Sequence, residues 1–180
     1  MHPRLKELID HLDRHHVTLL AAIDRVPEEQ RRTPPAPGAW SVVDVVEHLG
    51  TVAGRIGTRI NELVASARTA GAKADPDESP ILPMIPVDSF VDRGTKREAP
   101  TAVQPQRQLD DKSARERLAL AHAQLRKAIA DSQGVNLSEL TMPHGQFGMM
   151  NLYHWVAFAG SHESRHAVQI DEIGNKLAGA

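Results

Sequence analysis

Apolar residues recur at spacings of three and four in four separate segments of this chain. Of all the features of the sequence, this periodicity places the strongest limit on the folds that the chain can adopt. The first segment begins near residue 5 and ends before Pro27, and the others cover about 41–70, 110–132 and 148–173. Such spacing places side chains on one face of an α-helix, whereas a half-buried strand needs strict alternation. No segment shows a competing strand pattern. We therefore predict an all-α fold of four amphipathic helices.

The connections between these segments differ greatly in length. The first two segments are joined by a short stretch containing Thr33-Pro34-Pro35-Ala36-Pro37-Gly38, which cannot be helical, so these helices should be antiparallel. Residues 71–108 hold six of the 12 prolines and can carry the chain back across the bundle. We predict a four-helix bundle, up-down-down-up, with a long Pro-rich crossover between helices 2 and 3. Ordered loops of this length are often functional, so we expect the crossover to cover a site mouth and influence substrate choice.

Length and composition favour one domain spanning residues 1–180. The hydrophobic fraction is 41%, and the formal net charge is −2 without a long run of one sign, which argues against nucleic acid or a membrane as partner. No apolar stretch approaches the roughly 18 residues that span a bilayer, and no signal-type segment opens the chain, so we expect a cytoplasmic protein. The chain has no cysteine, which excludes disulfides, thiolate nucleophiles and thiolate metal ligands.

Two histidines four residues apart, His162 and His166, stand out in the last helical segment. On a helix they lie one turn apart on one face, so both imidazoles can reach one divalent metal ion. Apolar residues such as Trp155 and Phe158 fall on the same side. Because burying two imidazoles there is costly unless their nitrogens are satisfied, the pair indicates a metal site.

The run His162-Glu163-Ser164-Arg165-His166 also matches H-E-x-x-H, the zinc metalloprotease motif, in which the Glu is a general base. The extended form of that motif needs Gly and His where this chain has Gln169 and Glu172, and little room remains for a distant downstream Glu. By helical angle, Glu163 also lies off the metal-facing line. We therefore expect the third ligand upstream and disfavour a protease.

His48 is the candidate for that third ligand. It lies about two turns into the second helix, at the boundary of the apolar stripe. In an up-down-down-up bundle, a rise of about 1.5 Å per residue puts His48 and His166 each about 10 Å below the same end. The loop lengths and the metal hypothesis therefore agree on one topology.

Two motifs resemble those of the DinB-like superfamily. Trp40-Ser41-Val42-Val43-Asp44-Val45-Val46-Glu47-His48-Leu49 resembles its opening W-S-x-x-E/D-x-x-x-H-L motif, and His162-Glu163-x-x-His166-x-x-Gln169-Ile170 resembles its closing H-x-x-x-H-x-x-Q-I signature. The resemblance covers nearly the whole chain. It implies an up-down-down-up bundle, commonly a homodimer, in which three histidines bind zinc, nickel or a similar divalent ion. His48, His162 and His166 match those three positions one for one.

Three neutral imidazoles would leave a divalent metal with open positions, and two chemistries follow. Water bound there can become a nucleophile for hydrolysis, or a substrate thiol can bind as thiolate. The resemblance implies both metal-dependent hydrolases and transferases that use thiols such as bacillithiol or mycothiol. We expect one zinc or nickel ion per chain and an enzyme of either type, acting on a small molecule such as a low-molecular-weight thiol. A non-catalytic metal-binding or stress-response module, and a helical interaction protein without metal, remain open.

Other residues are candidates for supporting roles. We interpret His16 and His122, on inward helical stripes, as satisfied core histidines, with a role beside the metal or substrate as the alternative. We expect Glu163 to be solvated or paired with its neighbour Arg165, and Trp40 to anchor one end of the core. His144 is of interest because its Pro-His-Gly loop precedes the last helix. The sequence assigns no catalytic residue.

Overall fold

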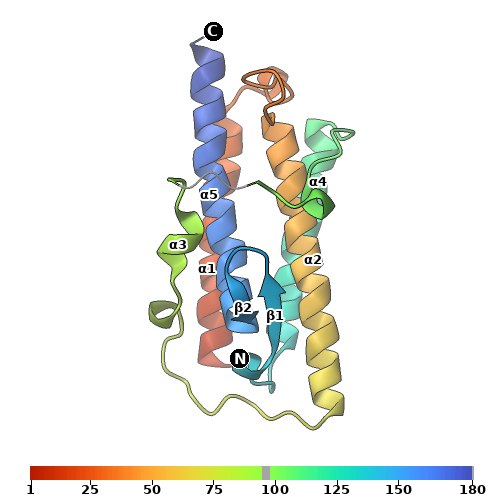
Figure 1. Ribbon diagram of the computed structural model, residues 1–180, viewed down its shortest axis with the longest axis vertical. Helices are drawn as coiled ribbons and strands as arrows, with labels where there is room; N and C mark the ends of the chain where they lie inside the picture. Colours follow the sequence, from red (N-terminus) through yellow and green to blue (C-terminus); the bar gives the residue numbers. More distant parts are fainter. Residues whose placement is uncertain (95–97, 180) are drawn as a thin grey trace.

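The computed structural model describes residues 1–94 and 98–179. Four long helices lie side by side along one axis (Figure 1): α1 (Pro3–Arg25), α2 (Val42–Thr69), α4 (Asp111–Asp131) and α5 (Leu152–Ala178). Figure 1 shows that α1 and α5 run in one direction and α2 and α4 in the other. α1 packs along α5, and α2 packs along α4. The predicted up-down-down-up four-helix bundle is confirmed.

The helices begin where side chains accept hydrogen bonds from the free backbone N–H groups of the first turn. The Ser41 hydroxyl accepts the N–H of Asp44 at 3.2 Å, and the Asp44 carboxylate accepts the N–H of Ser41 at 2.9 Å. This reciprocal pair is a capping box that starts α2 at the residue indicated by the sequence. Asp110 and Asn151 each cap their helices, α4 and α5, through one side-chain oxygen.

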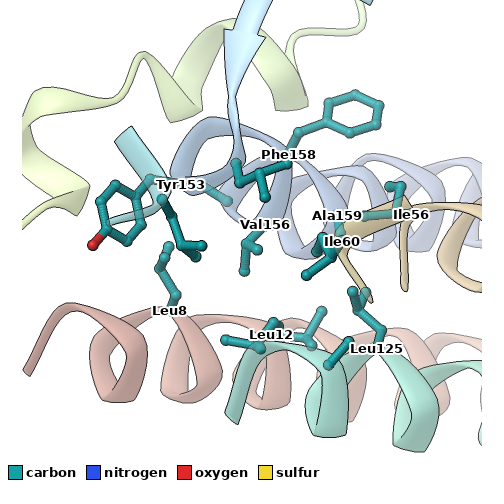
Figure 2. Close-up of a cluster of buried hydrophobic side chains, with 14 of the residues drawn as sticks. Leu8, Leu12, Ile56, Ile60, Leu125, Tyr153, Val156, Phe158 and Ala159 are labelled. Carbon is teal, nitrogen blue, oxygen red and sulfur yellow. The ribbon is translucent and has the colours of Figure 1, made fainter. Parts of the chain in front are cut away.

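The apolar core is divided into two clusters along the bundle axis. Figure 2 shows the first, where side chains from all four long helices meet; among them are Leu8, Leu12, Ile56, Ile60, Leu125 and Val156. The second cluster joins the opposite halves of the same helices and includes Leu19, Val45, Leu118 and Ile170. On α1 and α5, the two clusters are separated by residues 13–18 and 160–166. Those two stretches carry His16, His162, Glu163 and His166, so the site lies at the level where the apolar core is interrupted.

The crossover between α2 and α4 is held by buried contacts at its start. It contains the short helix α3 (Val87–Val91), which packs on α5, and 3₁₀ turns at Leu82–Met84 and Thr101–Val103. The Arg4 guanidinium of α1 binds the carboxylate of Asp75 at 2.8 Å, and the Tyr153 hydroxyl donates to the same carboxylate at 2.9 Å. Three apolar side chains of the crossover are buried in the first cluster; they are Ile81, Ile85 and Phe90.

The start of the last helix differs from the prediction. Residues 148–151, which we expected to be helical, form strand β2 (Gly148–Asn151), antiparallel to β1 (Thr141–His144). α5 begins only at Leu152, because Asn151 has an extended backbone and its side chain accepts the N–H of His154 at 3.0 Å. Four-residue strands are too short to show an alternating pattern, so the hairpin had no detectable sequence signal.

Across residues 1–94 and 98–179, no helix combines the length and apolar character needed to cross a membrane.

Candidate metal centre

The structure brings the three predicted histidines together. His48 comes from α2, and His162 and His166 come from successive turns of α5. The Nε2 atom of His162 lies 3.4 Å from Nε2 of His48 and 3.0 Å from Nε2 of His166. His48 and His166 are buried, and His162 is half-buried. His48 is more than a hundred residues from the other two histidines in sequence, yet the Nε2 atoms of all three rings point to one place.

Hydrogen bonds on the opposite ring nitrogens decide where the protons are. Nδ1 of His48 donates to the backbone carbonyl of Val103 at 2.7 Å, and Nδ1 of His166 donates to Oε1 of Gln169 at 2.7 Å. A neutral imidazole carries one N–H, so Nε2 of both rings is a bare lone pair. Only His162 can supply a hydrogen to this contact, and it can point that hydrogen at one partner. At least two lone pairs therefore converge without a donor between them.

The spacing of these nitrogens fits a shared metal ion. Zinc–nitrogen bonds of about 2.0–2.1 Å place the ligand atoms of a tetrahedral site roughly 3.4 Å apart. The observed separations of 3.0 and 3.4 Å are close to this value. A cation would also remove the repulsion between lone pairs, so this donor set fits a divalent metal that prefers nitrogen ligands.

The surroundings keep all three rings neutral. Burial lowers the pKa of His48, although the hydrogen bond to Val103 opposes it. Burial, and then the charge that His48 would carry, lower the pKa of His166 to about 3. Burial and the charges of His166 and His48 lower the pKa of His162 well below its usual value. Neutral imidazole is the form that binds metals, so no competition from protons is expected near pH 7.

A buried carboxylate next to His48 holds the crossover in place. Glu47, which is 3% exposed, accepts the N–H groups of Gln106 and Arg107 at 3.1 and 3.2 Å. Arg107 has φ of 60°, in the left-handed region that non-glycine residues rarely adopt. These bonds fix the end of the crossover against α2, and the same segment supplies the Val103 carbonyl that orients His48.

Neither of the two supporting groups beside His48 was predicted from the sequence. Glu47 had a usable signal, because it is a charged residue in the buried first turns of α2. Val103 had none, because its contribution is a backbone carbonyl.

Aromatic rings surround the three histidines. The Phe158 ring stacks on His162 with centroids 5.0 Å apart, and the Trp40 ring lies 5.1 Å from His48. His144 of β1 packs 4.7 Å from Phe158 and 5.0 Å from Trp155. Trp40 packs against the second core cluster, as predicted, but it also forms part of the site. The hairpin that the sequence did not predict is what brings His144 here.

A cleft of about 1660 Å³ opens beside this centre. All three histidines line it, together with His144, Gln169 and crossover residues that include Phe90 and Val103. Pockets for one small ligand usually measure about 300–1,000 Å³, so this cleft has room for more than one.

Glu163 differs from its predicted environment. It is neither solvated nor directed at the three-histidine centre, because it is 3% exposed and accepts a hydrogen bond from Nδ1 of His16 at 3.1 Å. His122 of α4 stacks on His16, with centroids 3.7 Å apart, and places Nδ1 3.9 Å from the Glu163 carboxylate. Its Nε2 bonds to Asp13 at 3.2 Å. His16 is therefore a satisfied core histidine, as interpreted, whereas His122 is satisfied only at Nε2, because its buried Nδ1 has no hydrogen-bond partner among the described residues.

The ionisation of this second cluster follows from its contacts. Burial would raise the pKa of Glu163, but the bonds and charges of His122 and His16 outweigh it and lower that pKa. Burial would likewise lower the pKa of His122, but Glu163 and Asp13 outweigh it and raise that pKa. The three ligand-type atoms are also within reach of one cation. However, rings stacked at 21° cannot both point an in-plane lone pair at one ion, so we interpret this cluster as a hydrogen-bonded ion pair.

The chain is similar to known proteins along most of its length. The family model described as the DinB superfamily matches residues 11–170. The chain is 28% identical over 151 residues to the uncharacterized protein YuaE of Bacillus subtilis (strain 168), a match that covers 83% of this chain and 86% of YuaE. It also resembles the crystal structure of TT2238, described as a four-helix bundle protein, with a TM-score of 0.63 and 19% identity over 93% of this chain and 98% of that one. The likeness to TT2238 shows the fold alone.

Proposed function

Because the chain belongs to the DinB superfamily, we propose that it is a metal-dependent enzyme that transfers a low-molecular-weight thiol, with one divalent ion held by His48, His162 and His166. The observation that carries the proposal is the convergence of three Nε2 atoms, at least two of them bare lone pairs. The family match, and the two motifs that resemble the opening and closing motifs of this family, support the same three residues.

Neutral nitrogen ligands favour zinc or nickel as the native ion. When bound, such an ion would lower the pKa of a thiol or of water at its open position. The protein's own contribution is to set the ligands in advance. Val103 and Gln169 hold His48 and His166 in the tautomer that leaves Nε2 bare. Phe158 and Trp40 place apolar rings beside His162 and His48 and limit the access of water.

The arrangement suits a thiol better than water. The pKa of a free thiol is about 8.5 and that of water about 15.7, so hydrolysis depends more on a base beside the metal. In H-E-x-x-H proteases the Glu has that role. Here Glu163 is bonded to His16 of α1, away from the histidines that face α2. Since the chain has no cysteine, the reacting sulfur must belong to a substrate.

Hydrolysis is the second candidate, and His144 is the observation that favours it. This histidine lines the cleft, and its Nδ1 accepts the N–H of Gln146 at 3.1 Å. Its Nε2 therefore carries the ring hydrogen in the neutral form and is a donor. A donor there would stabilise the oxyanion that forms when water attacks a carbonyl.

A thiol panel tests the proposed function. Protein reconstituted with zinc or nickel is incubated with bacillithiol, mycothiol or glutathione and a chromogenic electrophile, and separately with chromogenic esters. We expect thiol-dependent turnover that is lost in His48→Ala and His166→Ala and kept in His15→Ala, a histidine outside the cleft. Ester turnover without thiol would favour hydrolysis. Metal binding without either activity would favour a non-catalytic module.

A further inference from the structure

The cleft beside the three histidines is strongly basic, although the chain as a whole is slightly acidic. Among the described residues that line it, six are Arg or Lys and two are Glu, a formal charge of +4, against −2 for the whole chain. We call the six basic residues the basic wall; they are Arg55, Arg59, Arg93, Arg117, Arg165 and Lys176.

Ion pairs use only part of this charge. Arg59 pairs with Glu62 at 2.8 Å, and Arg93 bonds to Glu172. Arg55 and Arg117, by contrast, are exposed and make no ion pair with any residue in 1–94 or 98–179. Arg55 follows His48 by seven positions on α2, which is two turns along the same helical face. Two unpaired guanidinium groups therefore line the same cleft as the three histidines.

The basic wall extends to the metal centre itself. Arg165 lies between the two α5 histidines in sequence, lines the cleft and is only 9% exposed. The three candidate ligands are neutral, so a divalent ion there would add its full charge. Guanidinium groups match carboxylate and phosphate oxygens in a bidentate manner.

We propose that the basic wall binds an oxyanion group, a carboxylate or a phosphate, carried by the thiol substrate. This inference rests on the thiol-transfer function proposed above and adds the chemical class of the substrate. The sulfur would enter at the histidines while the oxyanion lies against Arg55 and Arg117. A neutral thiol would have only the first of these contacts.

Matched thiols measured on cobalt(II)-loaded protein test the inference. Cobalt(II) occupies the same kind of nitrogen site, and a bound thiolate adds an intense charge-transfer band from which the dissociation constant is obtained. Mercaptosuccinate is compared with 2-mercaptoethanol for the carboxylate, and coenzyme A with pantetheine for the phosphate. We expect the charged member of at least one pair to bind at least tenfold more tightly at low salt, and the advantage to shrink as salt screens the charges.

Arginine variants identify the basic wall as the cause. In the double variant Arg55→Gln and Arg117→Gln, both exposed positions, we expect the charged thiol to lose most of its advantage while the neutral thiol binds as before. Arg14→Gln, an exposed arginine of α1 outside the cleft, should change neither. Equal affinities within both pairs, or an advantage untouched in the double variant, would overturn the inference.

A second readout separates this inference from the thiol function. Succinate and the neutral succinamide are titrated calorimetrically into zinc-loaded protein and into the double variant. If no thiol produced a charge-transfer band, the proposed thiol chemistry would be wrong. Succinate binding that depends on Arg55 and Arg117 would still support the oxyanion site. Succinate that binds no better than succinamide, or equally well to both proteins, would overturn it.

Discussion

Nδ1 of His48 donates a hydrogen bond to the backbone carbonyl of Val103, 2.7 Å away and 55 residues later in the chain. The bond joins α2 to the end of the crossover, and Glu47 fixes that end through the N–H groups of Gln106 and Arg107. The orientation of a candidate metal ligand therefore depends on a loop that the sequence showed only as Pro-rich. Partners of this kind on the second ring nitrogen commonly change metal affinity by about 10–100-fold.

Glu47→Gln should weaken metal binding without unfolding the protein. A glutamine keeps one oxygen, which can accept a hydrogen bond from the N–H of Gln106 or of Arg107. Its NH₂ group would face the remaining N–H, and two donors cannot bond to each other. The segment that carries Val103 should therefore loosen. We expect the zinc dissociation constant to rise by about tenfold. Competition with a zinc chelator measures it, and Glu116→Gln, at an exposed position of α4, is the control. An unchanged dissociation constant would mean that Glu47 does not position His48.

Glu163→Gln should affect stability rather than the metal. The change removes the charge that balances His122 and weakens the bond from His16, so we expect a loss of about 2 kcal/mol in the free energy of unfolding. Denaturant unfolding measures this loss. Metal stoichiometry and turnover should stay close to those of the wild type. Abolished turnover in a folded variant would instead restore Glu163 as a general base.

Gly160→Ala should separate α1 from α5. A Cβ at Gly160 would lie 2.7 Å from Cδ2 of His11 and 3.3 Å from Cα of Leu12, so either the ring or the α1 backbone must move. Overpacking of this kind costs about 1–3 kcal/mol. The control is Gly145→Ala in the hairpin turn, where a Cβ meets nothing within 4 Å. Equal free energies of unfolding for the two variants would contradict the tight α1–α5 contact.

His11 should make the protein less stable in acid. Burial, and then the charge of His15, lower the pKa of His11 to about 4, although its bond to the Ala157 carbonyl opposes this. The unfolded chain takes up a proton near pH 6.5 and the folded protein only near pH 4. The free energy of unfolding therefore falls as pH drops through this window, by about 3 kcal/mol, and levels off below it.

The contribution of His11 is isolated by comparing wild type with His11→Gln, because other buried histidines also titrate. Denaturant unfolding of both proteins between pH 7 and pH 4 gives the difference. A glutamine cannot take up the proton, so the variant should have a shallower slope. Parallel curves would show that His11 does not cause the acid sensitivity.

The sequence predicted those features that depend on local chemistry or on repeated spacing. Helix periodicity predicted the four helices, and the contrast between the short first connection and the long crossover predicted the topology of the bundle. The same topology brought His48 toward His162 and His166, because the position of each along its helix was known. Their convergence followed from counting residues down from one end of the bundle.

The features that were missed depend on tertiary contacts. The β1–β2 hairpin is too short to show a period, and its partner strands stabilise each other only once folded. Glu163 was placed off the metal-facing line by helical angle, but no angle showed that α1 and α4 would offer it His16 and His122. The Val103 carbonyl is a backbone group, so its residue type carried no information.

The direct test of the central claim is the metal content and ligand set of the purified protein. Elemental analysis together with X-ray absorption should show one zinc or nickel ion per chain, with three imidazole nitrogens at about 2.0–2.1 Å. His48→Ala and His166→Ala should each abolish tight binding, whereas His15→Ala should not. An unchanged metal-to-protein ratio in both His48→Ala and His166→Ala would contradict the account.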